Sequence, residues 1–216
     1  PILALKNEEI RYSDFIALKD ISLSIYQGEK VALIGQSGSG KTTLLRRLYQ
    51  LQPDKCAFIH QQYSLVSQLT TFHNIYMGKL DIHPVAHNLR NLVAPSKIRI
   101  SEIRPIAAKL GLEEKLFTRI GELSGGQQQR VGIGRALYRG GSILMADEPV
   151  SSLDLIQSKE IMEFITHTDK TVISSLHSID HSQRFFDRII GLKDKSIFFD
   201  LPVQDVSESL LNQLYV

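Results

Sequence analysis

The stretch KVALIGQSGSGKTTLLRRLYQL, Lys30 to Leu51, decides the fold. It opens with a short apolar run, which is typical of a buried strand, and it ends in KTTLLRRLYQL, which is typical of a helix. Between the two, GQSGSGKTT at Gly35 to Thr43 satisfies the pattern GxxxxGK(S/T). Glycines let the backbone close around phosphate oxygens, and the amides at the helix start then face the anion. The stretch therefore predicts a phosphate-binding loop between a strand and a helix.

The residues of this loop have separate expected roles. Lys41 is expected to reach the β- and γ-phosphates of a nucleotide, and the Thr42 hydroxyl is expected to ligate Mg²⁺. The other loop residues are expected to line the phosphates: Gly35, Gln36, Ser37, Gly38, Ser39, Gly40 and Thr43. A glycine-rich turn without a ligand is the alternative, which the flanking strand and helix disfavour.

A second chemical signal is ILMADE, where a buried strand ends in two carboxylates, Asp147 and Glu148. Asp147 is expected to hold Mg²⁺, directly or through water. Glu148 is expected to polarise a water molecule for in-line attack on the γ-phosphate. Alone, such a strand end reads equally well as the start of a solvated loop. The phosphate loop favours the catalytic interpretation.

Further short apolar runs predict the rest of the sheet. SILMAD, TVISSLH, RIIGL and SIFFD read as strands, and runs this short favour a largely parallel sheet that is buried on both faces. LIQSKEIMEFITH reads as a helix whose apolar face holds Ile156, Ile161, Phe164 and Ile165. We therefore expect a single α/β domain.

The stretch from about residue 63 to 139 differs from the rest. Its patterns are mostly helical, with Pro84, Pro95 and Pro105 as expected breaks. We interpret 63–139 as a helical subdomain inserted into a nucleotide-binding core made of residues 1–62 and 140–216.

Composition excludes several classes of protein. The 216 residues are 43% hydrophobic and carry a net charge of +2, which gives no electrostatic reason to expect nucleic acid as a partner. Cys56 stands alone, so no internal disulfide forms and a reducing compartment fits. The seven histidines lack metal-ligand spacing. The first residues, PILALKNEEIRYSD, become charged too early for a secretory signal, and no apolar run is long enough to span a bilayer. Any membrane role is therefore expected to be peripheral.

The stretch LSGGQQQRVGIGRAL, Leu123 to Leu137, looks like a second anion site. A serine and two glycines precede a helix, whose N-terminal amides attract anions. The alternative is that Ser124 only caps the helix.

The order of the motifs carries a resemblance. The phosphate loop is followed by Gln61 in FIHQQYSL, then LSGGQQQR, ILMADEP, SSLD, and His177 in SSLHSID. This order resembles the ATP-binding subunits of ABC transporters over nearly the whole chain. The resemblance implies an ATPase with a RecA-like P-loop NTPase core, working as a head-to-tail dimer with ATP and Mg²⁺. In such dimers the signature of one subunit, here Ser124, Gly125, Gly126 and Gln127, contacts the γ-phosphate of ATP held by the other.

The same resemblance implies further roles. Gln61 matches the glutamine that senses Mg²⁺ and the γ-phosphate and links to the membrane subunit, with Gln62 as a rival. His177 matches a histidine that hydrogen-bonds the γ-phosphate, although a packed histidine is an alternative. Asp154 matches an aspartate that crosses the dimer interface, and it is also placed to cap a helix. Tyr12 matches an aromatic residue that stacks on adenine; core packing is the alternative and Phe15 the fallback.

The tail and the stretch YSLVSQLTTFHNIYMGKL resemble the ATP-binding subunit of phosphonate importers. This implies a second ATP-binding subunit, integral membrane permease subunits and, indirectly, a periplasmic substrate-binding protein, with the chain at the cytoplasmic face of the inner membrane. LSGGQQQR does not discriminate, because amino-acid importers and lipoprotein-releasing complexes share it. The alternatives are another ABC importer or exporter branch, a soluble ABC ATPase acting on nucleic acid or ribosomes, and a regulatory module with degraded catalysis.

Two features depart from the family pattern. Only 19 residues separate Lys41 from Gln61, where relatives carry a longer segment with antiparallel strands, so we expect a truncated antiparallel subdomain. Gly132 and Gly134 stand where relatives usually have alanine. Glycine within a helix costs about 0.8–1 kcal/mol relative to alanine, so the helix is either softer or too closely packed for a methyl group.

Overall fold

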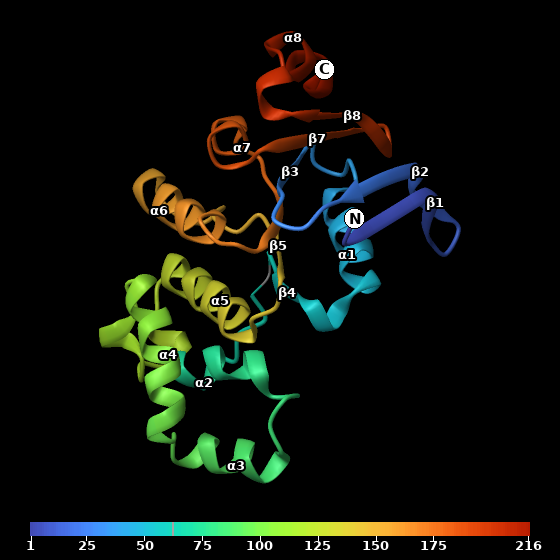
Figure 1. Ribbon diagram of the computed structural model, residues 1–216. Coiled ribbons are helices and arrows are strands. Elements are labelled where there is room, and N and C mark those ends of the chain that lie inside the picture. Colours follow the sequence, from blue (N-terminus) through green and yellow to red (C-terminus); the bar gives the residue numbers. More distant parts are fainter. Residues whose placement is uncertain (62) are drawn as a thin grey trace. The chain divides into compact units, whose positions relative to one another are not determined.

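The structure, a computed structural model, describes residues 1–61 and 63–216 (Figure 1). It divides into two compact units. The first comprises residues 1–58, 141–149 and 155–216, and the second comprises residues 59–140 and 150–154. Gln62, the rival of Gln61, lies outside the described residues.

The main sheet has six strands in the order β4-β5-β6-β3-β7-β8. The strands are β3 (Lys30–Ile34), β4 (Cys56–Ile59), β5 (Ile143–Asp147), β6 (Thr171–Ser175), β7 (Arg188–Lys193) and β8 (Ser196–Pro202). β3 pairs in parallel with β6 and β7, β6 pairs in parallel with β5, and β8 is antiparallel to β7. The predicted largely parallel sheet is thus confirmed.

The parallel register brings the predicted motifs to one end of this sheet, where the strands finish. Leu33 of β3 and Asp147 of β5 both pair with Ser175, the last residue of β6. The phosphate loop follows β3, Glu148 follows β5 and His177 follows β6. All three therefore leave the sheet at the carboxyl ends of adjacent strands, where α/β proteins bind their ligands.

Helices α1 (Lys41–Leu51), α6 (Leu155–Thr166), α7 (Ile179–Phe185) and α8 (Glu208–Tyr215) belong to this unit. α1 buries Leu44, Leu45 and Leu48 in the core. The predicted apolar face of α6 is wrong at Ile156, which is 73% exposed, while Ile161 and Ile165 are buried. The reason is helical geometry, because five residues turn a helix by about 500°, which places Ile156 roughly 140° away from Ile161.

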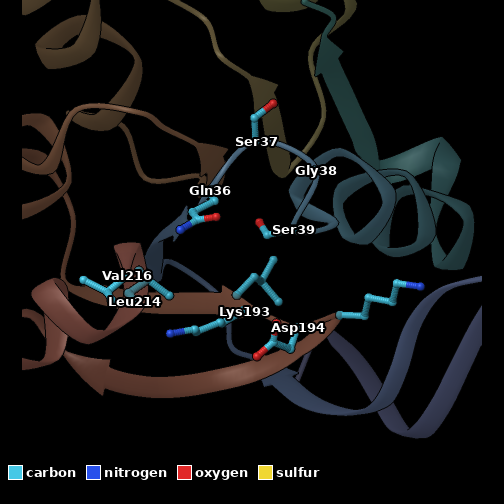
Figure 2. A pocket seen from close by; sticks show the side chains of 10 residues that line it. Gln36, Ser37, Gly38, Ser39, Lys193, Asp194, Leu214 and Val216 are labelled. Atoms are coloured by element: carbon cyan, nitrogen blue, oxygen red, sulfur yellow. The ribbon is translucent and has the colours of Figure 1, made fainter.

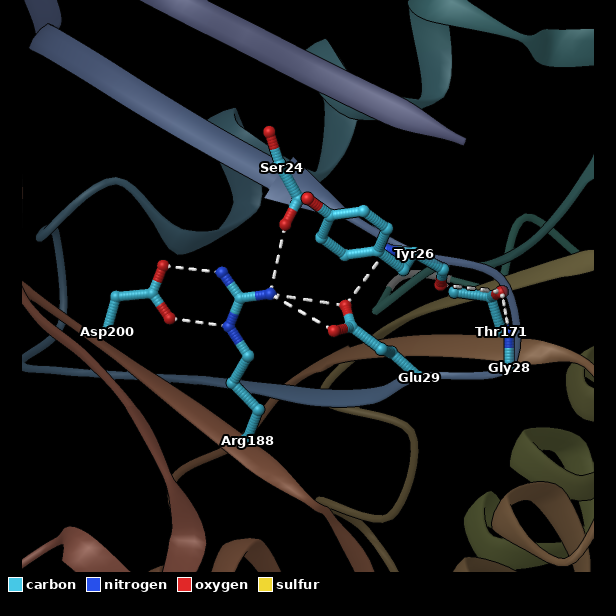
Figure 3. Close-up of polar contacts among 7 residues, drawn as sticks. All are labelled: Ser24, Tyr26, Gly28, Glu29, Thr171, Arg188 and Asp200. Atoms are coloured by element: carbon cyan, nitrogen blue, oxygen red, sulfur yellow. Dashed lines mark hydrogen bonds and ion pairs between the residues drawn. The ribbon is translucent and has the colours of Figure 1, made fainter. Parts of the chain in front are cut away.

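A separate two-stranded antiparallel sheet holds β1 (Leu3–Tyr12) and β2 (Phe15–Ile25). The guanidinium of Arg188 joins this sheet to the main one (Figure 3). It makes two hydrogen bonds of 2.6 Å to the carboxylate of Asp200, and its third nitrogen donates to the Ser24 carbonyl at 2.9 Å and to Glu29 at 3.2 Å. These pairings raise the pKa of Arg188. One partly buried side chain thus connects β2, β7, β8 and the start of β3.

The short connection after the phosphate loop has a simple structure. α1 ends at Leu51, a 3₁₀ turn covers Pro53–Lys55, and β4 begins at Cys56. This part of the described chain therefore holds no antiparallel strands. Among the described residues, the separate antiparallel sheet is the β1–β2 pair, and the antiparallel pairing of β8 with β7 lies within the main sheet.

The second unit is mainly helical. Its α-helices are α2 (Thr71–Tyr76), α3 (Val85–Val93), α4 (Lys97–Lys109) and α5 (Gly125–Arg139). Pro84 is the N-cap residue of α3, so a helix boundary lies at this proline as expected. The break expected at Pro105 is wrong, because α4 runs through it. Proline removes one hydrogen bond from a helix interior. Burial of Ile103 and Ala107 on either side of Pro105 stabilises the helix in spite of that loss.

The glycines of α5 face close neighbours. A Cβ added at Gly132 would lie 3.1 Å from the Tyr63 ring, and one at Gly134 would lie 3.1 Å from Ile75. Arg135, between them and the helix end, donates to the carbonyls of Asn74 and Tyr63 at 3.0 and 3.2 Å. Close packing thus accounts for Gly134, whose neighbour Ile75 is fully buried, and less strongly for Gly132, whose neighbour Tyr63 is partly exposed. None of the helices among the described residues is both long and apolar enough to cross a membrane.

Candidate nucleotide site

The phosphate loop lies between β3 and α1 and uses its glycines where a side chain does not fit. Gly38 and Gly40 have φ values of +79° and +105°, in the left-handed region that favours glycine. A Cβ at Gly40 would overlap the side chain of Leu18, and one at Gly35 would overlap the Leu192 carbonyl oxygen. The loop therefore rests directly on its neighbours, with its backbone brought close to the helix start.

Lys41 lies at the first position of α1 and is 6% exposed. Its ammonium donates to the carbonyl oxygens of Gly35 and Gln36 at 2.8 and 3.0 Å. Burial lowers the pKa of Lys41, while the carboxylates of Glu148 and Asp147 act in the opposite direction. A buried ammonium inside the curve of the loop fits a polyphosphate, whose negative charge favours the protonated form.

Thr42 and Asp147 meet across two elements of the same unit. The Thr42 hydroxyl donates to Oδ1 of Asp147 at 3.0 Å, and the Ser175 hydroxyl donates to the same oxygen at 2.6 Å. Asp147 is 3% exposed. A hydroxyl and a carboxylate oxygen this close together are ligands that suit Mg²⁺, which also takes phosphate oxygens and water. The residues present therefore fit the ion that the sequence predicts.

Glu148 has an unusual backbone, with a φ of +50°. Its amide donates to the Ser175 hydroxyl at 3.0 Å and to the Ser175 carbonyl at 3.3 Å. Such a conformation costs about 1–3 kcal/mol for a residue with a side chain, and it persists where surrounding contacts hold it. The geometry turns the Glu148 side chain toward His177, whose Nε2 lies 2.6 Å from Oε1 of Glu148.

Tyr12 ends β1 and pairs with Phe15 at the start of β2. Tyr12 is 52% exposed and Phe15 is 59% exposed, so core packing of Tyr12 is wrong. One face of the Phe15 ring is covered by the Lys195 ammonium, which lies 4.2 Å from the ring centroid. An exposed aromatic ring at Tyr12 remains suited to stacking on a base.

The other predicted residues belong to the second unit. Ser124 caps α5, accepting from the Gln127 amide at 3.3 Å, while the Gln127 side chain accepts from the Ser124 amide at 3.0 Å. Ser124 therefore does cap α5, as the alternative interpretation expected. This cap places Gly125 and Gly126 in the first turn of the helix. Asp154 directly precedes α6, and Gln61 follows β4 with an exposed side chain.

Ser175 is a site residue that we did not predict. Its hydroxyl orients Asp147 and its backbone and side chain together hold Glu148. The available signal was a serine at the end of the apolar strand TVISS, which was expected to be buried on both faces, because a buried hydroxyl needs a partner. The parallel pairing of β5 with β6 supplies that partner. This pairing could not be predicted from the sequence of either strand alone.

Comparison with known proteins places these motifs in one family. Residues 18–151 match the family model described as ABC transporter. The chain is 35% identical to the phosphonates import ATP-binding protein PhnC of Maricaulis maris, an alignment that covers 99% of this chain and 93% of the relative. It is 36% identical to a phosphonates import ATP-binding protein PhnC 1 of Pseudomonas syringae pv. syringae, covering 99% and 91%.

Solved structures agree with the fold. A dimeric structure of MJ0796, described as a bacterial ABC transporter cassette, is 29% identical with a TM-score of 0.79, covering 94% of this chain and all of that one. A post-hydrolysis dimer of the same cassette bound to ADP and Pi is 30% identical with a TM-score of 0.76, at the same coverage. The chain therefore belongs to the ABC transporter family, as one of its ATP-hydrolysing cassettes.

Proposed function

We propose that this chain is the ATP-hydrolysing subunit of an importer for phosphonate or a related phosphorus compound. One observation carries the ATPase part: at one end of the sheet Thr42 contacts Asp147 at 3.0 Å and His177 contacts Glu148 at 2.6 Å, while the phosphate loop before them holds the Lys41 ammonium at 2.8 Å from the Gly35 carbonyl. These are the groups that phosphoryl transfer needs, because catalysis rests on positioning and charge stabilisation.

In the proposed site, each group acts on a different part of ATP. The loop amides and Lys41 would bind the phosphates, and the exposed ring of Tyr12 would stack on the base. Thr42 and Asp147, with Gln61, would hold Mg²⁺, which neutralises developing charge when bound. Glu148 would orient and polarise the attacking water, and His177 would hold Glu148 and hydrogen-bond the γ-phosphate.

A second subunit completes the site in this proposal. Ser124, Gly125, Gly126 and Gln127 of one subunit would face the ATP held by its partner, with Asp154 crossing the interface. The capping box of Ser124 and Gln127 supports this, since it fixes the N-terminus of the 15-residue helix α5, whose dipole favours an anion. The two dimeric cassette structures described above also support it.

Changing Ser124 to arginine tests the composite site. Binding of ATP by the isolated chain is expected to stay at the parent level, because the phosphate loop is untouched. Hydrolysis at dimer-forming concentrations is expected to fall to background. Parent-level hydrolysis by this variant would contradict the proposal.

Residues 63–139 would serve as the helical subdomain that contacts the permease. An apolar groove of about 240 Å³ lies on this unit, lined by residues of α2, α3 and their connection: Leu69, His73, Tyr76, Met77, Leu80, Val85, Asn88, Leu89 and Leu92. Two of the lining residues, Val85 and Leu89, are 74% and 60% exposed. Exposed apolar patches of this kind mark interaction sites. The permease would hold the chain at the cytoplasmic face of the membrane.

Leu89→Asp tests this surface, with Ile156→Asp as the matched control, since Ile156 is 73% exposed on α6 in the other unit. Leu89→Asp is expected to abolish co-purification with the permease, while ATP hydrolysis by the free chain stays unchanged. Equal loss in both variants, or in neither, would contradict the assignment.

The substrate is proposed from the relatives, which are named as phosphonate importers and align over 99% of this chain. A strain lacking this gene is expected to lose uptake of a radiolabelled alkylphosphonate and to regain it with the parent chain. The Glu148→Gln chain is expected not to restore uptake. Undiminished uptake in the deletion strain would contradict the substrate, while leaving the ATPase intact.

A further inference from the structure

Gln36 differs from the rest of the phosphate loop in where its side chain lies. Its amide nitrogen Nε2 donates to the carbonyl oxygen of Tyr215, at the end of α8, at 2.8 Å. Figure 2 shows the side chain directed from the loop toward the residues that close α8, Leu214 and Val216. The contact therefore joins the nucleotide-binding loop to a helix 179 residues away in sequence.

The end of α8 is a suitable anchor. Two carbonyls of its last turn accept hydrogen bonds from side chains outside the helix. Gln36 takes the Tyr215 carbonyl, and the Lys193 ammonium donates to that of Gln213. The helix itself is held in the unit by Leu211 and Leu214, which are 6% and 0% exposed. α8 is thus held in the unit by its buried leucines, and its Tyr215 carbonyl contacts the loop.

Between Gly35 and Gly40, which rest on Leu192 and Leu18, the rear of the loop borders open space. A cavity of about 290 Å³ separates it from the β7–β8 turn and α8, lined by Gln36, Ser37, Gly38, Ser39, Leu192, Lys193, Asp194, Lys195, Leu214 and Val216 (Figure 2). The Ser39 hydroxyl borders this cavity, is buried, and has no hydrogen-bond partner among the described residues. The cavity leaves the loop room to shift backward. The hydrogen bond from Gln36 to Tyr215 acts as a tether that limits this shift.

We propose that Gln36 is a positioning residue, which fixes the phosphate loop for ATP by tying it to the end of α8. The proposal rests on the ATP site described above. Gln36 acts through Tyr215 and α8, and only its backbone would face phosphate. Loss of the tether would allow the loop to relax into the cavity, which weakens ATP binding more than it changes the hydrolytic step.

Two substitutions in the full-length chain test this link. Gln36→Ala removes the donor. Asn212→Pro breaks the last turn of α8 at an exposed position, since proline removes the hydrogen bond of its own amide and clashes with the preceding turn. Asn212→Ala is the matched control that keeps the helix. Thermal unfolding midpoints show whether each variant is folded, and a folded Asn212→Gly chain, whose glycine weakens the same turn, replaces Asn212→Pro if that variant does not fold.

Gln36→Ala is expected to raise the Kd and KM for ATP by about threefold to tenfold, the effect of one lost neutral hydrogen bond, with kcat within about twofold of the parent. Asn212→Pro is expected to do the same, Asn212→Ala to match the parent, and the double variant to be no worse than either single one. Parent-level ATP affinity in Gln36→Ala, or multiplied effects in the double variant, would overturn the tether. Failure of the parent chain to bind ATP would instead overturn the proposed function.

Discussion

Nε2 of His177 lies 2.6 Å from Oε1 of Glu148, so the side chains that follow two adjacent parallel strands are already paired in the single chain. The two residues come from the carboxyl ends of β6 and β5, whose last residues, Ser175 and Asp147, share a hydrogen bond of 2.6 Å. The proposed catalytic carboxylate is therefore held by its backbone on one side and by an imidazole on the other. This arrangement leads to the following predictions.

Ser175→Ala is expected to lower kcat for ATP hydrolysis by about tenfold or more, because a hydrogen bond to a charged group contributes about 1.5–3 kcal/mol. The substitution removes one of the two hydroxyl donors to the Asp147 carboxylate and one of the two acceptors of the Glu148 amide. Ser174→Ala is the matched control, since its buried hydroxyl donates to a backbone carbonyl at 3.3 Å. Steady-state kinetics over a range of Mg²⁺ concentrations measures both variants, and equal kcat values for the two would contradict the role of Ser175.

Gly134→Ala and Gly132→Ala are expected to differ in stability. Each gains about 0.8–1 kcal/mol of helix propensity. At Gly134 the new methyl group meets Ile75, which is fully buried, and overpacking of this kind typically costs about 1–3 kcal/mol. At Gly132 it meets the Tyr63 ring, which is partly exposed and able to move aside. Urea unfolding should show a less stable Gly134→Ala chain and an unchanged or more stable Gly132→Ala chain; the reverse order would count against the packing account.

Arg188→Met is expected to destabilise the chain by about 1–3 kcal/mol, because it leaves the partly buried carboxylates of Asp200 and Glu29 without their cation. Arg104→Met is the comparison, since its pair with Glu113 is solvent-exposed and such pairs contribute about 0–1 kcal/mol. Chemical denaturation of both variants at one pH measures the difference. Equal losses of unfolding free energy would show that the network in Figure 3 does not stabilise the chain more than an exposed ion pair does.

Stability is expected to fall as the pH drops below 6.5, in part because of His181. Burial lowers the pKa of His181 in the folded chain, Arg184 acts in the same direction and Asp180 opposes it. The folded state therefore binds fewer protons than the unfolded state in this range, so stability is present above pH 6.5 and is lost as the pH falls through the folded pKa. His181→Leu is expected to reduce this slope in urea unfolding measured from pH 7.5 to 5. An identical slope in both chains would remove His181 as the cause.

The strongest sequence signals were those in which local pattern and chemistry coincide. The stretch Lys30 to Leu51 predicted strand, loop and helix, and the structure has β3 and α1 at those places. Parallel pairing then follows from short buried runs, and it explains why Asp147 and His177 leave the sheet at the same end. Ser175 was not, since its role depends on the register between β5 and β6.

Other features depend on packing between distant segments. Neither of the two accounts of Gly132 and Gly134 was favoured by the sequence, because Tyr63 and Ile75 lie more than fifty residues away. The Gln36 contact with Tyr215 is likewise non-local. Pro105 shows the opposite error, where a strong local rule was overridden by burial of its neighbours on α4.

ATP hydrolysis by the Glu148→Gln chain, measured at dimer-forming concentrations beside the parent, tests the central claim most directly. The amide keeps the shape of the side chain but does not polarise water as a carboxylate does. The account predicts that turnover falls to background while ATP binding, measured by equilibrium dialysis, stays at the parent level. Hydrolysis by Glu148→Gln at the parent rate would contradict it.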